Sequence, residues 1–186
     1  MKTESTVKFI ARLAFTLFLI SAVTAGLLAG VNSITAPMIE QVNMQKQIDA
    51  MSAVVPDADT AELVDYTDPN GVILEVYKTA SAYAIKVAAP GGFGGSIEMM
   101  VGVSQDGTVL GISVINHAET AGLGAIAADK TDKGQAFRAQ FEGLSGTVAV
   151  TKDGGTVESI TGATISSRAV CNGVNAAVEY VVNNAG

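Results

Sequence analysis

The run from Leu13 to Val31 constrains this chain more than any other feature. It reads LAFTLFLISAVTAGLLAGV and contains no charged residue. A helix of about 20 apolar residues is long enough to cross the hydrocarbon core of a bilayer. It also explains why hydrophobic residues make up 48% of a chain that otherwise reads as a water-soluble domain. We predict a single transmembrane helix at residues 13–33, after a short N-terminal segment at residues 1–12.

The charges on either side of this run indicate its orientation. Lys8 and Arg12 precede it, whereas Glu40 and Asp49 follow it. Because positive residues favour the cytoplasmic side, the N-terminus is expected in the cytoplasm and the rest of the chain beyond the cell (inner) membrane. A cleaved signal peptide would have the same polarity, and residues 22–25 offer a weak processing site. The length of the apolar run favours a retained, single-pass anchor.

Composition excludes several classes of function. The chain has 11 basic and 18 acidic residues and a net charge of −7, which argues against binding to nucleic acid. Cys171 is the only cysteine and His117 the only histidine, so we expect neither an internal disulfide nor a structural metal site.

The segment after the anchor is expected to form an extracytoplasmic helical linker at residues 34–69. Pro37 interrupts the apolar pattern, and a helix is then predicted over residues 41–55. Four of its apolar residues share one side at helical spacing: Met44, Ile48, Met51 and Val55. Pro56 and the Asp-rich stretch that follows indicate a loop at the entrance to the folded domain.

Residues 70–186 are predicted to form an α+β domain, an antiparallel sheet with packed helices. Asp106-Gly107 and Asp153-Gly154-Gly155 each indicate a hairpin turn, and the glycine cluster at residues 91–95 indicates a mobile loop or a close backbone approach. A short helix is expected within residues 131–143 and a long one over residues 165–183. The expected strands span residues 72–78, 83–88, 97–104, 109–115, 148–152 and 157–160. The apolar stripe of the long helix comprises Val170, Val174, Ala177, Val178, Val181 and Val182.

A turn of small residues, Thr161-Gly162-Ala163-Thr164, leads into the long helix. Such a turn aims backbone N–H groups and short hydroxyls at one point, which suits an anionic phosphate. On its own it is more simply an ordinary strand-to-helix turn in which Thr164 or a neighbour caps the helix. A second motif, His117-Ala118-Glu119-Thr120-Ala121-Gly122-Leu123-Gly124, gathers polar groups and glycine just after a predicted strand, as at the edge of a ligand pocket.

Together the two motifs resemble the FMN-binding domain of the RnfG/RsxG and NqrC families, subunits of membrane complexes that couple electron transfer to ion movement. The first motif is similar to the flavinylation signature of these families, and the resemblance implies one FMN per chain, joined through its phosphate to the hydroxyl of Thr164. The second is similar to a family motif whose equivalents here, Glu119, Thr120 and Leu123, would lie against the flavin. The chain departs from the family pattern at Glu158, usually Asp, and at Ala121, usually Pro.

The resemblance implies a redox subunit that relays electrons, with the sites for soluble substrates on other chains. We expect FMN as the cofactor, with Glu158 recognised during flavinylation and Thr164 modified. The expected partners are the lipid bilayer, other membrane subunits of an Rnf-type complex and a flavin transferase of the ApbE type. The expected cofactor-binding residues are Thr161, Gly162, Ala163, Ser166, Ser167, His117, Glu119, Thr120, Leu123 and Gly124.

Three alternatives remain at this point. The first is an NqrC-like subunit of a sodium-pumping NADH:quinone reductase, although the length of the chain favours RnfG. The second is a membrane-tethered module that holds FMN or another phosphorylated ligand without a covalent bond. The third is a thiol enzyme using Cys171 and His117, which is disfavoured because neither residue has a visible orienting partner.

Overall fold

The computed structural model describes residues 6–184, which divide into two compact units between Gln45 and Lys46. The first five residues of the expected N-terminal segment, and the last two of the expected domain, lie outside the described residues. The first long helix, α1, spans Thr6–Val54 and contains Pro37. The expectation that Pro37 separates two helices is therefore wrong. Proline removes one backbone hydrogen bond, and a helix with intact turns on both sides can continue through it.

Within the described residues, one helical segment is long and apolar enough to cross a membrane, and it lies in α1 at Lys8–Val54. None of its most apolar window is buried against other parts of the protein. Large apolar side chains point outward along it, among them Phe15, Phe18 and Leu27, each about two-thirds exposed (65%, 69% and 67%). A helix with such a surface requires an apolar environment, and a bilayer provides one.

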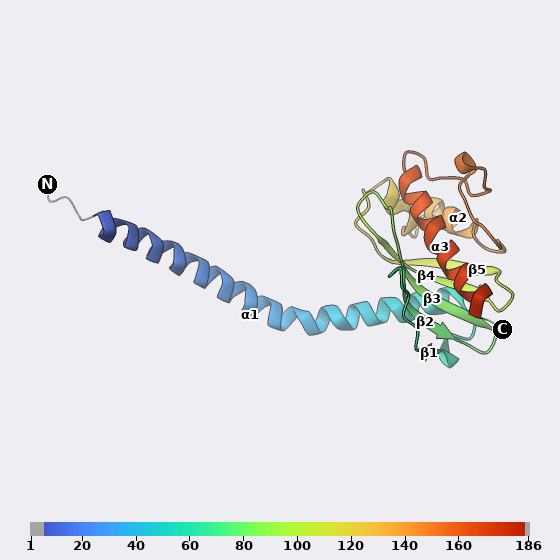
Figure 1. The fold of residues 1–186 in the computed structure, drawn as a ribbon, viewed down its shortest axis with the longest axis horizontal. Coiled ribbons are helices and arrows are strands. Elements are labelled where there is room, and N and C mark those ends of the chain that lie inside the picture. The colour runs from blue at the N-terminus through green and yellow to red at the C-terminus, as the bar shows by residue number, and fades with distance from the viewer. Residues whose placement is uncertain (1–5, 185–186) are drawn as a thin grey trace. The chain divides into compact units, whose positions relative to one another are not determined.

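The second unit is built on a five-stranded antiparallel sheet with the order β1-β2-β3-β4-β5 (Figure 1). The α+β class predicted from the sequence is confirmed. The strands are β1 at Glu62–Val64, β2 at Ile73–Lys78, β3 at Ala82–Ala89, β4 at Ile97–Ser104 and β5 at Val109–Asn116. The remaining elements are the helices α2 at Asp132–Ala139 and α3 at Thr164–Asn184 and the short 3₁₀ turns η1 at Ala58–Thr60, η2 at Gly124–Ala127 and η3 at Thr151–Asp153.

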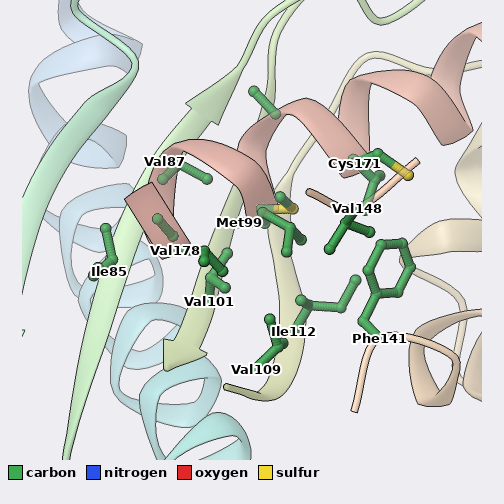
Figure 2. Packing of buried hydrophobic residues seen from close by; sticks show 14 of the residues in the cluster. Ile85, Val87, Met99, Val101, Val109, Ile112, Phe141, Val148, Cys171 and Val178 are labelled. Atoms are coloured by element: carbon green, nitrogen blue, oxygen red, sulfur yellow. The ribbon is translucent and has the colours of Figure 1, made fainter. Parts of the chain in front are cut away.

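Helices cover both faces of the sheet. α3 packs over β3 and β4, and Figure 2 shows Val87, Met99 and Val101 beneath this helix, close to its Val178. The end of α1, which belongs to the second unit, packs on the opposite face through a smaller apolar cluster. Because β3 and β4 are buried on both faces, their sequences are almost continuously apolar instead of alternating.

A close backbone approach and a group of polar contacts mark where the end of α1 meets the sheet. Gly102 of β4 lies so close to the helix that a Cβ there would clash with the carbonyl of Val54. Beside it, Gln47 Nε2 donates hydrogen bonds to Glu75 Oε2 at 2.5 Å and to Tyr77 Oη at 2.8 Å. Lys86 Nζ donates to Glu75 Oε1 at 3.2 Å. Desolvation, with the carboxylate of Glu75 adding to it, raises the pKa of Tyr77 to about 12.

Several local expectations were wrong. The hairpin predicted over residues 148–160 is absent, because the chain forms η3 there and turns at Gly154 in the left-handed region, leaving one parallel bridge between Val150 and Val157. On α3 the expected stripe is buried except for Val182, which is 65% exposed. Met44 and Ile48 are likewise exposed, although Met51 and Val55 on the same predicted side are buried.

Candidate functional site

The two sequence motifs meet at the N-terminal end of α3. They enclose a pocket of about 320 Å³, at the lower end of the range of about 300–1,000 Å³ usual for small-molecule sites. Most of the predicted site residues therefore lie in one place. The pocket is lined by Phe93, Glu119, Thr120, Leu123, Gly124, Lys152, Gly162, Ala163, Thr164, Ile165 and Ser166.

Thr164 is the first residue of α3, and its side chain lines the pocket. Its Oγ1 accepts a hydrogen bond from Lys152 Nζ at 3.2 Å. The local tie between the turn and the helix is made instead by Ser167, whose Oγ accepts from Ile160 N and donates to the carbonyl of Ala163, both at 3.0 Å. Thr164 thus lies at the N-terminus of α3, where the helix dipole favours negative charge.

Glu119 connects three segments that surround the pocket. The residue is 8% exposed. Oε1 accepts from Gly94 N at 2.9 Å, and Oε2 accepts from Ser166 Oγ on α3. Gly124 is required beside them, because a Cβ at this position would clash with both Glu119 Oε2 and Ser166 Oγ. Through the hydrogen bond from Gly94 N, the glycine cluster at residues 91–95 is joined to the motif that contains Glu119.

Four of the predicted cofactor or recognition residues do not line this pocket. Ser167 is fully buried, and His117 lies outside, with Nδ1 accepting from Glu119 N at 3.2 Å. Glu158 and Thr161 line a neighbouring groove beside α2. There Gln140 pairs with the backbone of Glu158, accepting from its N–H at 2.7 Å and donating to its carbonyl at 3.2 Å.

Sequence reasoning missed three pocket residues: Phe93, Lys152 and Ile165. Phe93 projects from the glycine cluster and is 71% exposed, while Leu123 and Ile165 are 41% and 50% exposed. The pocket therefore combines an apolar rim with a polar end at Lys152 and Thr164. A phosphorylated ligand with a flat apolar ring fits this division, so the residues present are compatible with FMN.

Cys171 is separate from this chemistry. Its side chain is 3% exposed in the core cluster, beside Val148 and Phe141 (Figure 2). Burial raises the pKa of the Cys171 thiol to about 11, so little thiolate exists at neutral pH. This environment is that of a structural cysteine and argues against the thiol-enzyme alternative.

Comparison with known proteins identifies the class to which this fold and pocket belong. Residues 92–179 match the FMN-binding domain, and residues 1–54 match the RnfG N-terminal region. The chain is thus an FMN-binding domain protein with an RnfG-type N-terminal helix.

Full-length relatives define the family more closely. Over 95% of this chain and 93% of the relative, it is 34% identical to the G subunit of the Na⁺-translocating ferredoxin:NAD⁺ oxidoreductase complex of Acetobacterium woodii. It is 37% identical to the proton-translocating counterpart of Clostridium ljungdahlii, over 86% of this chain and 85% of the relative. It is 33% identical to the G subunit of the ion-translocating oxidoreductase complex of Methanosarcina acetivorans, over 94% of this chain and 95% of the relative. The chain belongs to this RnfG family.

Proposed function

We propose that this chain is the flavin-bearing electron-transfer subunit of an Rnf-type ion-translocating oxidoreductase complex, with FMN joined to Thr164 by a phosphoester bond. The observation that carries the proposal is the position of Thr164. Its hydroxyl opens into the pocket at a helix N-terminus and faces a lysine ammonium group at 3.2 Å. FMN would supply the electron-transfer chemistry, whereas the chain would supply position and electrostatics.

The attachment replaces the proton of the Thr164 hydroxyl with the flavin phosphoryl group. A flavin transferase would supply an activated flavin phosphate: the bond between Oγ1 and phosphorus would form, the bond from that phosphorus to the activating group would break, and the activating group would leave. The hydroxyl proton would pass to solvent, and the product would weigh one water less than the chain plus free FMN. The product carries one negative charge at the start of α3. Ser167 N is bonded to the carbonyl of Ala163, so the N–H groups of Ile165 and Ser166 and the positive helix end would stabilise such a charge, by about 0.3–1 kcal/mol.

The apolar rim gives the ring system a place to rest. Phe93, Leu123 and Ile165 present exposed apolar surface around the pocket, which is unfavourable in water and is relieved when an aromatic ligand covers it. Glu119 fixes the pocket walls to one another through Gly94 and Ser166. Partial exposure of the ring at this rim would suit electron exchange with a neighbouring subunit.

The anchor is proposed to hold this domain on the extracytoplasmic side of the cell membrane, within reach of the other membrane subunits. Gly26 and Gly30 form a small-xxx-small pattern that suits close packing against another membrane helix. A covalent tether keeps the cofactor at an effective concentration of order mM where free FMN is scarce. Because the relatives' names include both sodium and proton translocation, membership of the family is compatible with either ion.

Intact-mass measurement of the chain purified from its native host tests the proposal. We expect a mass above that of the sequence by one FMN minus one water, and Thr164→Ala should abolish the addition. Thr156→Ala, at an exposed threonine that does not line the pocket, is the matched control and should leave the addition unchanged.

Two results would contradict the assignment. One is a normal flavin content in the Thr164→Ala chain. The other is flavin that leaves the wild-type chain on denaturation, with the chain at its unmodified mass. This second result would favour the non-covalent binding module.

A further inference from the structure

We propose that Lys152 is the phosphate-binding cation of the pocket and that the neighbouring Asp153–Arg168 ion pair holds it in place. The inference deepens the proposed function and rests on it, because it assigns to the phosphate of FMN a partner outside both sequence motifs. The observations behind it are one hydrogen bond, one ion pair and the distribution of charge around the pocket.

Lys152 is brought to the pocket by η3, the turn formed where a hairpin was expected. It lies 12 positions before Thr164 in the sequence, yet its Nζ donates to Thr164 Oγ1 at 3.2 Å. If Thr164 Oγ1 were esterified, an ammonium group at this distance would also be within reach of the other oxygens on the same phosphorus. Lysine acts on phosphate as a compact point charge with three donors, so it does not need one fixed orientation.

The carboxylate next to Lys152, that of Asp153, is bound mainly by Arg168, and Lys152 adds a weaker Coulombic attraction to it. Asp153 accepts two hydrogen bonds from Arg168 of α3, from Nε at 2.6 Å and from an Nη nitrogen at 2.7 Å. This two-point contact between planar groups binds η3 to the first turns of α3, the helix that carries Thr164. The pair thus has a positioning role: it fixes the turn beside the helix and engages the carboxylate that follows Lys152 in the sequence.

The charges that line the pocket are consistent with this role. Lys152 and Glu119 are its two charged residues. The carboxylate of Glu119 accepts hydrogen bonds from Gly94 N and Ser166 Oγ and the residue is 8% exposed, so Glu119 belongs to the wall of the pocket. Positive charge and helix N–H groups coincide at Thr164, which is where an anionic group would be stabilised.

The test compares two ligands that differ only in the phosphate, FMN and riboflavin. The full chain is expressed in a host without a flavin transferase and purified in detergent. The dissociation constants of the two flavins are measured by quenching of flavin fluorescence. Lys152→Met should weaken FMN binding by about tenfold and leave riboflavin binding unchanged. Lys152→Arg should recover most of the FMN affinity, because it keeps the charge.

Lys133→Met is the matched control, since it removes one positive charge from an exposed lysine of α2 that does not line this pocket. It should change neither constant by more than about twofold, because exposed charges at a distance are screened by salt. The inference is overturned if Lys152→Met changes FMN binding no more than Lys133→Met, or if it weakens riboflavin equally.

A second readout covers the case in which free flavins bind too weakly to measure. The chain is incubated with a flavin transferase for a limited time, and the esterified fraction is read by intact mass. The control in this assay is Lys78→Met, at an exposed lysine of β2 that lines neither the pocket nor the groove beside α2. Lys152→Met should lower the esterified fraction about tenfold relative to Lys78→Met, and equal fractions would overturn the inference. Failure of the proposed function is recognised separately: the native chain would lack the FMN mass at Thr164, whatever Lys152 does to FMN binding.

Discussion

The hydrogen bond between Ser166 and Glu119 offers the sharpest test of how the pocket is built. Ser166→Ala removes the donor to Glu119 Oε2 and leaves Gly94 N as the remaining described donor to this carboxylate. Ser166 is 2% exposed and Glu119 is 8% exposed, so water cannot easily replace the lost donor. A hydrogen bond to a charged group contributes about 1.5–3 kcal/mol. At roughly 3 °C per kcal/mol for a domain of this size, the melting temperature should fall by about 4–9 °C.

The single cysteine provides the assay. Cys171 is buried in the core, so a thiol-reactive fluorogenic dye reports unfolding of the full chain in detergent during a temperature ramp. The effect should depend on the charge of Glu119. In a Glu119→Gln background the same bond is neutral, and Ser166→Ala should cost only about 0.5–1.5 kcal/mol.

The double-mutant cycle decides between this reasoning and a simple packing effect. We expect a coupling energy of about 1 kcal/mol or more between Ser166 and Glu119. If Ser166→Ala shifts the melting temperature equally in both backgrounds, the charge of Glu119 has no part in the cost and the argument fails. A shift below about 1 °C in the wild-type background would refute it as well.

Two further predictions concern the face of the sheet that the end of α1 covers. Gly102→Ala should destabilise the domain by about 1–3 kcal/mol, because the added methyl group would clash with the carbonyl of Val54. A methyl group at Gly111 on β5 would meet Val54 only at an ordinary contact distance of 3.9 Å, so Gly111→Ala should cost far less. Equal losses in the Cys171 assay would contradict this packing. The second prediction concerns Tyr77, whose pKa is raised to about 12 in the folded protein, so that folding favours the neutral phenol. The contribution of Tyr77 to the free energy of unfolding should therefore be constant below about pH 10 and decline as the pH rises toward 12. Tyr77→Phe should remove this decline from the pH dependence of the free energy of unfolding, and an unchanged profile would show that another group is responsible.

The sequence predicted those parts of the fold in which local pattern and tertiary context agree. The hairpin at residues 97–115 combines a turn with flanking apolar strands, and α3 combines a turn with a helical stripe, so both were recovered. The hairpin predicted around Gly154 failed, because the same Asp-Gly-Gly signal also suits a 3₁₀ turn that ends in the left-handed conformation. β1 was missed because it has only three residues and its pairing with β2 supplies what its sequence lacks.

The pocket was predictable only where short motifs carry it. Both glycine-containing motifs were recognised, and the structure places Glu119 and Thr164 together in one pocket although 45 positions separate them. Lys152 and Phe93 carry no such signal. One reaches the pocket through the unexpected turn η3, and the other stands in a glycine cluster whose closeness to Glu119 depends on folding.

The order of the strands has a consequence for how the protein matures. Each strand pairs with its neighbour in the sequence, so the sheet can assemble progressively as the chain is synthesised, with few long loops to close. The helix that supplies one wall of the pocket comes last. A nascent chain could therefore form the sheet before the cofactor pocket exists. Attachment of a cofactor would have to wait until α3 has been synthesised.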